Sequence, residues 1–243
     1  MKTNRLYITL TFLGILILSS CSVDTIHVNA NDIVTYRDVN ITDYSSVKIA
    51  NGFTAYITFS NTEESIKVEA NENLHDYIIA TKKNNELIIR FKNNFKIKGK
   101  ETLNVYITTK PINNFYVTAD SQIYLENTLV GDNAKIKITA DSFFSGEVDV
   151  DYLELKAAAD ANADLLGSVN ALNADLSADA KLSGYDLRIK DLKIKMMADC
   201  QANITVSKTI NIEAFADCTL RYKGNATIIR ENLKADSRII KVN

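Results

Sequence analysis

Apolar and polar residues alternate along most of the second half of this chain. The alternation runs through residues 153–157 (LELKA), and it returns at residues 172–176, 192–196 and 210–214. A period of two places successive side chains on opposite faces of a strand, so that one face is buried and the other meets water. We therefore predict strands with one buried face through this half of the chain.

The dipeptide Ala-Asp punctuates these strands at a regular interval. Its aspartates follow one another at spacings of 21, 19, 19, 20, 18 and 19 residues, and they are Asp120, Asp141, Asp160, Asp179, Asp199, Asp217 and Asp236. A repeat of this length is typical of a solenoid, whose units bury their apolar faces only by stacking on each other. We predict an all-β fold, a β-helix with rungs of about 19 residues that each hold two or three short strands. The Ala of each pair is expected to fill a small inward slot, and the Asp to point outward at a turn.

Residues 157–182 (AAADANADLLGSVNALNADLSADAKL) are rich in alanine, and helix propensity alone would favour a helix there. The apolar residues nevertheless alternate instead of recurring at three and four, and Asp, Asn, Ser and Gly interrupt the segment. We therefore predict strands for this segment as well.

Two of the three cysteines directly follow an Ala-Asp pair. The residue at this position is Ser, Ser, Ala, Ala, Cys, Cys and Ser in the seven repeats, which predicts a slot for small side chains. Cys200 and Cys218 would lie on adjacent rungs, close enough for a disulfide in principle, and an exported location permits one. Because stacked parallel side chains rarely reach disulfide torsion angles, we predict two buried free thiols. The absence of supporting histidines argues against a zinc site.

The N-terminus has the features of a lipoprotein signal. Lys2 and Arg5 form a short basic region, and residues 6–18 form an apolar one that is too short to span a bilayer comfortably. The sequence LSSC then resembles a bacterial lipobox, which predicts a signal peptide over residues 1–20 and lipid attachment at Cys21. The alternative is an ordinary signal peptide with a chance cysteine. We expect an outer-membrane lipoprotein of the cell envelope, with a tether over residues 21–40 and with the leaflet left open.

The composition excludes some classes of protein. The net charge of −2 gives no electrostatic footprint for nucleic acid, so no nucleic-acid partner is expected. No phosphate loop, dinucleotide fingerprint or metal-spaced His/Cys cluster is present. The chain has no tryptophan to stack on a sugar ring; the tyrosines that remain for this are Tyr116, Tyr124, Tyr152, Tyr185 and Tyr222.

β-Helices also host polysaccharide lyases and hydrolases, so paired carboxylates are candidate catalytic groups. The candidate pairs are Asp160 with Asp164, Asp175 with Asp179, and Asp149 with Asp151. All lie on the outward parity of the repeat or beside a corner, where a solvated, turn-forming carboxylate is expected. His27 and His75 are the only histidines, and both precede the repeats. We predict no catalytic residue and no enzyme; a carbohydrate-active enzyme is the alternative.

A column of aspartates at rung spacing would repel itself, and bound Ca²⁺ would relieve that repulsion. The glycine-rich nine-residue repeat of calcium-binding β-rolls is absent, and salt screening and water can also separate such charges. The seven corner aspartates are therefore a candidate ion ladder, with calcium as the only cofactor considered and no metal site firmly predicted.

The chain resembles the head GIN domain family of putative auto-transporter adhesins, which is common among Bacteroidetes lipoproteins. The resemblance rests on an ordered series of segments, namely residues 44–91 (beginning YSSVKIANGF), 103–127 (beginning LNVYITTKPI) and 220–243 (beginning LRYKGNATII). Ala-Asp-Ser, Ala-Asp-Ala or Ala-Asp-Cys replaces the family's glycine-rich turn. Without glycine, the family's usual tight-turn conformation is not expected with certainty at these corners, although the period is unchanged.

The resemblance implies a right-handed β-helix in two parts. Residues 41–110 would form an N-terminal β-rich cap over the end of the stack, with a hairpin turn at KKNNE, and residues 111–243 would form the repeats, all as one continuous domain. It also implies a role in adhesion. The repetitive surface suits an extended partner, such as a polysaccharide or an envelope or host protein, and the membrane would be reached through the lipid. A periplasmic structural or assembly component is the other alternative.

Overall fold

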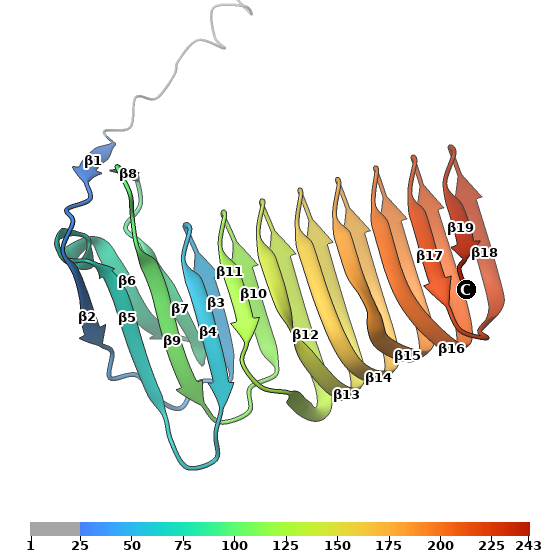
Figure 1. The fold of residues 1–243 in the computed structure, drawn as a ribbon, viewed down its shortest axis with the longest axis horizontal. Coiled ribbons are helices and arrows are strands. Elements are labelled where there is room, and N and C mark those ends of the chain that lie inside the picture. The colour runs from blue at the N-terminus through green and yellow to red at the C-terminus, as the bar shows by residue number, and fades with distance from the viewer. Residues whose placement is uncertain (1–24) are drawn as a thin grey trace, which may run out of the picture.

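The computed structural model describes residues 25–243, which form a flat solenoid of β-strands (Figure 1). The predicted signal peptide and the predicted lipid attachment residue Cys21 lie outside the described residues. The repeat region holds β10 (Asn114–Thr118), β11 (Gln122–Leu125), β12 (Leu129–Thr139), β13 (Phe143–Ala158), β14 (Asn162–Ser177), β15 (Lys181–Met197), β16 (Gln201–Phe215), β17 (Thr219–Lys223), β18 (Thr227–Lys234) and β19 (Arg238–Lys241). The stack has about seven turns with rungs about 19 residues apart, which confirms the predicted all-β solenoid and its period.

Neighbouring rungs pair in parallel, one repeat apart. Leu153 of β13 aligns with Leu172 of β14, which aligns with Leu192 of β15 and then with Ile210 of β16. The alanine-rich segment forms the end of β13, all of β14 and the start of β15, so the strand prediction is confirmed there. The middle rungs differ from the expectation of two or three short strands, because each is one bent strand of 15–17 residues that runs from corner to corner.

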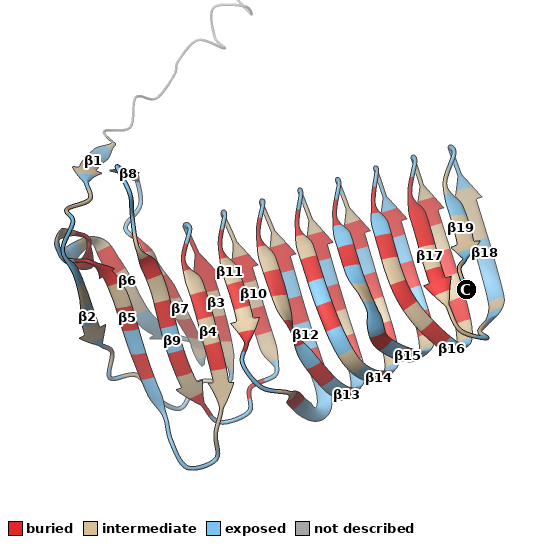
Figure 2. Ribbon diagram, in the orientation of Figure 1, coloured by how far each residue is buried: buried red, intermediate tan, exposed pale blue. Residues whose placement is uncertain are grey.

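Alternation along the strands separates the core from the surface. The apolar residues at the predicted inward positions are fully buried along the stack, including Leu155, Leu176, Ile194 and Ile212. Figure 2 shows the resulting alternation of buried and exposed residues along each rung. Burial of aliphatic side chains at every rung, worth about 1.5–3 kcal/mol for each large one, stabilises the stack.

Each Ala-Asp corner turns the chain with two successive left-handed residues. All seven alanines and all seven aspartates of the pairs have φ between +49° and +63°. The amides of the first six corner aspartates, Asp120 to Asp217, each donate to the carbonyl oxygen of the Ala one rung on, for example from Asp199 to Ala216 over 2.9 Å. The tight-turn conformation that glycine normally supplies is therefore present without glycine, because bonds to the neighbouring rungs hold it in place.

The residue that points inward at each corner is the one after the Asp, and not the Ala before it as expected. The alanines of the pairs, expected to fill an inward slot, are half-buried or exposed, since both left-handed residues lie on the outside of the turn. The residue after the Asp points inward instead. It is buried in six of the seven repeats, as Ser121, Ser142, Ala161, Ala180, Cys200 and Cys218, which confirms the predicted slot for small side chains there; Ser237 in the last repeat is half-buried.

The N-terminal part closes one end of the stack. It contains β3 (Ser46–Ala50), β4 (Thr54–Phe59), β5 (Ser65–Asn71), η2 (Glu72–Tyr77), β6 (Ile78–Lys83), β7 (Glu86–Phe91), β8 (Phe95–Lys98) and β9 (Leu103–Thr109). β3 and β4 continue the parallel ladder against β10 and β11, and β7 and β9 stack in parallel beyond them. The pairing then becomes antiparallel, with β6 on β7 and β5 on β9. Asn84 and Asn85, both with positive φ, form the hairpin turn between β6 and β7.

The predicted tether over residues 21–40 requires correction where the structure describes it. β1 (Ile26–Asn29) pairs in parallel with β8, and β2 (Val34–Asp38) pairs with β5 in the antiparallel sense. These strands were not predicted because they contain many polar residues. β2 lies at the edge of the sheet with one face in water, so polar side chains are tolerated there. Within residues 25–243 no helix is both long enough and apolar enough to span a bilayer.

Candidate functional site

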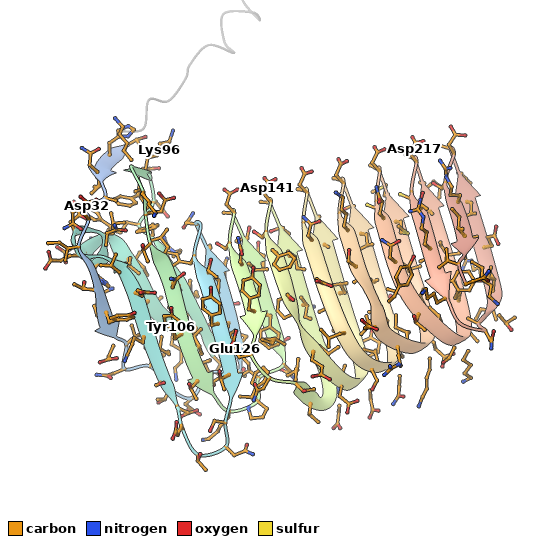
Figure 3. All side chains as sticks on the ribbon, viewed as in Figure 1. Asp32, Lys96, Tyr106, Glu126, Asp141 and Asp217 are labelled. Atoms are coloured by element: carbon orange, nitrogen blue, oxygen red, sulfur yellow. The ribbon has the colours of Figure 1, made fainter. Side chains whose placement is uncertain are left out.

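The seven corner aspartates form a column of exposed carboxylates along one edge of the solenoid (Figure 3, where Asp141 and Asp217 are labelled). The corner bonds set them one rung apart, about 4.8 Å. Within residues 25–243 no three His, Cys, Asp or Glu side chains come close enough together to hold a metal ion. The candidate ion ladder is thus a single file of carboxylates and not a cluster.

The structure places the candidate carboxylate pairs on different surfaces. Asp160 lies at a corner and Asp164 on β14, while Asp175 and Asp179 are divided in the same way between β14 and a corner. Asp149 and Asp151 lie together at the bend of β13, where Asp149 accepts a hydrogen bond from Ser168 over 2.7 Å and Asp151 accepts one from Asn170. These contacts to the next rung give the two carboxylates a role in rung stacking.

The two histidines lie far from the repeats. His27 lies on β1, and His75 is buried in η2 with Nε2 3.2 Å from the carbonyl oxygen of Thr35. Nδ1 of His75 is buried, and no hydrogen-bond partner for it lies within residues 25–243. Neither residue lies beside a candidate aspartate pair, so these side chains form no Ser-His-Asp arrangement.

One face of the solenoid carries stacked aromatic rings. Tyr106 (β9), Tyr56 (β4) and Tyr124 (β11) stack with ring centroids 5.4 and 5.6 Å apart, and Phe143 follows at 5.6 Å. Because these rings cover one another's faces, a sugar ring would meet mainly their edges. Of the other candidate tyrosines, Tyr222 belongs to the core and Tyr185 lies under the ammonium group of Lys223.

The opposite sheet carries what we call the lysine face. It consists of two outward positions per rung on β3, β10, β12–β16 and β18. The first position is Ser46, Asn114, Lys135, Glu154, Asn173, Lys193, Asn211 and Arg230; the second is Lys48, Tyr116, Lys137, Lys156, Asp175, Lys195, Glu213 and Asn232. Buried apolar residues such as Phe115 and Ile136 alternate with them, so the same period that builds the core builds this face.

Two open hollows lie along the lysine face. The first, of about 470 Å³, is lined among others by Ser46, Asn84, Asn114, Tyr116, Lys135 and Lys137. The second, of about 300 Å³, is lined among others by Tyr152, Asn173, Lys193, Thr209, Asn211 and Ile229. Both are lined by amides, hydroxyls and lysines together with apolar side chains, and each also has one carboxylate, Glu86 in the first and Asp191 in the second. Such a mixed lining suits a ligand that presents both polar and apolar surface.

Two carboxylates of the lysine face are paired. Glu154 lies 3.2 Å from Nζ of Lys135 and 3.0 Å from Nζ of Lys156, and hydrogen bonds from Lys156 and then Lys135 lower the pKa of Glu154. Glu213 lies 2.8 Å from Arg230. Lys48, Lys137, Lys193 and Lys195 form no ion pair within residues 25–243.

Tyr116 lies between two of these unpaired lysines. The ammonium groups of Lys48 and Lys137 are each 4.6 Å from its ring centroid, and they come from the strands on either side of β10. Hydrogen bonding with the hydroxyl of Thr139, with Thr118 and the two lysine charges as further causes, lowers the pKa of Tyr116.

A family model described as putative auto-transporter adhesin, head GIN domain, matches residues 43–226. The chain belongs to this adhesin family. The match covers the cap and nearly all the repeats, and it confirms the resemblance noted in the sequence. No curated protein sequence matches the chain.

Solved structures share the fold of this head GIN domain protein. A putative adhesin from Bacteroides fragilis matches with a TM-score of 0.83 at 15% identity, over 88% of this chain and 100% of its own. A putative adhesin from Parabacteroides merdae matches with a TM-score of 0.70 at 17% identity, over 89% and 99%. A protein from Parabacteroides distasonis titled putative lipid binding protein matches with a TM-score of 0.67 at 13% identity, over 89% and 100%. Identities this low establish the shared fold alone.

The lysine face was not predicted, although its lysines alternate with apolar residues in the sequence. Aligning the repeats on Ala-Asp brings Lys137, Lys156 and Lys195 into one column and Lys135 and Lys193 into the next. That alignment was available in the sequence. The hollows depend on the stacking of side chains between rungs, and they could not be found in this way.

Proposed function

We propose that this member of the adhesin family is a non-enzymatic, lipid-anchored binding protein of the cell envelope, held to the outer membrane through Cys21. The observation that carries the binding role is the lysine face, where two hollows and four unpaired ammonium groups lie along one side of the stack. A repetitive surface of this kind suits an extended partner, because each rung can add a similar contact. Adhesion to a polysaccharide or to an envelope or host protein is the function that it supports best.

The anchor can be tested apart from the binding role. A Cys21→Ala substitution removes the proposed acylation site, so the protein should leave the membrane fraction and its lipid-dependent mass increase should disappear. Cys200→Ser serves as the matched control, since that residue is buried and should not affect anchoring. Membrane retention of the Cys21→Ala protein would contradict the anchor.

Surface display decides between adhesion and a periplasmic structural role. Protease added to intact cells should degrade a surface-displayed protein, whereas a periplasmic one should be cut only after the outer membrane is opened. Attachment of cells that carry Lys137→Gln and Lys195→Gln together should then fall relative to cells that carry Lys181→Gln. Lys181 is exposed on the opposite sheet and has no ion pair within the described residues, so it controls for the loss of positive charge.

A further inference from the structure

The unpaired lysines of the lysine face are spread along the axis of the solenoid. In the second position of the rungs, Lys48 and Lys137 lie two rungs apart, and Lys195 follows three rungs further on. At about 4.8 Å per rung these intervals are about 10 and 14 Å. Positive charge therefore recurs at intervals along a line and is not concentrated in one patch.

Between these charges the second position holds Tyr116, Lys156 and Asp175, and neutral hydrogen-bonding groups lie beside them in the first position. Asn114, Asn173 and Asn211 lie in the first position of the rungs, and their side-chain amides can both donate and accept hydrogen bonds. Asn114 lines the first hollow, and the other two line the second. Cations at intervals with amides beside them match a chain that is mostly hydroxylated and carries an acidic group at intervals.

Tyr116 fixes the position of two of the cations. Because the ring lies between Lys48 and Lys137 with 4.6 Å to each ammonium group, it attracts both and keeps them near the first hollow. Each ammonium group retains donors that the ring does not use. An anion placed over Tyr116 could accept hydrogen bonds from both lysines with little further ordering of their side chains.

Carboxylates border the lysine face on both sides. The seven corner aspartates run along one edge, and Asp149, Asp151 and Asp191 lie at the bend along the other. A negatively charged chain is repelled by both borders, so it gains most by lying lengthwise between them. A polymer of very high charge density, such as a nucleic acid, meets this repulsion at every unit.

We propose that the lysine face binds a linear acidic polysaccharide, one that carries carboxylates at intervals along an otherwise neutral chain, and that this chain lies along the solenoid axis. The carboxylates contact Lys48, Lys137, Lys193 and Lys195, while the amides of the asparagines contact the hydroxyl or acetamido groups between them. This inference rests on the proposed binding function and names the ligand class of the same face.

The test uses the full-length protein purified in detergent and a sensor surface coated with hyaluronan, whose carboxylates alternate with neutral acetamido sugars. Binding is expected to hyaluronan and not to neutral dextran, and it should weaken as salt is added because exposed charges are screened. Lys137→Gln with Lys195→Gln should weaken it by about tenfold, while Lys181→Gln on the opposite sheet should change it less than twofold. Tyr116→Leu should also weaken it, because the ring that holds both lysines is lost.

Equal binding to dextran, or an equal loss in Lys181→Gln, would overturn the proposal. Competition by single-stranded DNA as strong as that by free hyaluronan would also overturn it, in favour of a general polyanion surface. Cell attachment separates this inference from the proposed function. If the lysine variants reduce attachment but the protein does not bind hyaluronan, the ligand class is wrong and the binding function stands. If the protein binds hyaluronan but attachment does not depend on it, the adhesive function is wrong and the ligand class stands.

Discussion

Cys200 and Cys218 occupy the same corner position of adjacent rungs, and both are free and fully buried. Each thiol lies near carbonyl oxygens of its own corner, 3.3 Å from Met197 for Cys200 and 3.1 Å from Phe215 for Cys218. Ser121 and Ser142 fill the same slot and bond the same way to Ala119 and Ala140. The cysteines at the corners of Asp199 and Asp217 therefore serve packing and not redox chemistry. The prediction of two free thiols is confirmed.

Alkylation should reach these two thiols only when the protein unfolds. Burial raises the pKa of Cys200 to about 11, so the reactive thiolate is scarce in the folded state at neutral pH. Mass spectrometry after iodoacetamide treatment should find residues 200 and 218 unmodified in the native protein and modified in urea. Because the pKa of Cys200 is higher in the folded protein than in the unfolded one, its thiol contributes fully to the free energy of unfolding below the unfolded pKa. That contribution is lost as the pH rises towards 11. Rapid alkylation of the native protein at neutral pH would contradict this account.

Replacing a corner alanine by glycine should stabilise the protein. Ala178 has φ of +51°, where a Cβ is disfavoured and glycine is not. After subtraction of the greater freedom of glycine in the unfolded chain, Ala178→Gly should gain up to about 1 kcal/mol in the free energy of unfolding. The control is Ala174→Gly, a buried position within β14, which should lose about 1 kcal/mol. Urea unfolding followed by circular dichroism measures both changes, and a loss at both positions would refute the strain argument.

Gly167 should tolerate no side chain. Its φ is +105°, and an added Cβ would lie 2.1 Å from the carbonyl oxygen of Val148 on the rung before it. Gly167→Ala should therefore displace the backbone of two rungs and cost about 3 kcal/mol of stability. Gly131→Ala is the matched control, because a Cβ there meets no atom within 4 Å. Similar melting temperatures for the two variants would show that the rungs separate easily at the bend.

The corner aspartates should respond to salt and give a direct test of the ion ladder. Asp160→Asn with Asp199→Asn removes two charges and keeps side chains that tolerate left-handed φ, so it should raise the melting temperature at low ionic strength only. If the ladder holds Ca²⁺, millimolar calcium raises the melting temperature of the unaltered protein beyond the effect of sodium chloride at equal ionic strength. The double variant should then lose that extra gain. Equal effects of the two salts would mean that the carboxylates are screened and bind no ion.

Glu69 should make the attachment of β2 dependent on pH. Hydrogen bonds from Asn104, and then from Tyr36 of β2 and from Tyr106, lower the pKa of Glu69. A lowered folded pKa means that the stability is present above the unfolded pKa and is lost as the pH falls through the folded one. The pKa of Tyr106 is raised to about 12, first by burial and then by Glu69, so its contribution is lost between about pH 10 and 12.

We expect β2 to become accessible to protease in acid, as the pH falls through the lowered pKa of Glu69 and before the repeats unfold, and at neutral pH in the Glu69→Leu variant. Glu72→Gln is the control, because Glu72 is exposed in η2 and does not contact these tyrosines. Equal protection of β2 in all three proteins would show that its backbone ladder with β5 suffices.

The sequence by itself determined the period, the strands of the repeats and the small inward slot, because each rung of a solenoid is specified by its own short stretch of sequence. Alternation decides which face is buried, and the Ala-Asp spacing decides where each rung turns. The cap and the hairpin at Asn84 and Asn85 were expected from the family resemblance, and their apolar alternation and turn residues are local signals that agree with it.

Only the tertiary structure decided what depends on neighbouring rungs. The corner alanines lie outside because both left-handed residues are held by hydrogen bonds to the next rung, which no local pattern reveals. β2 is a strand because β5 offers it a partner 33 residues away, between Tyr36 and Glu69. Tyr116 binds two lysines because β3 lies beside β10 across nearly 70 residues of chain, and the hollows of the lysine face follow from the same stacking.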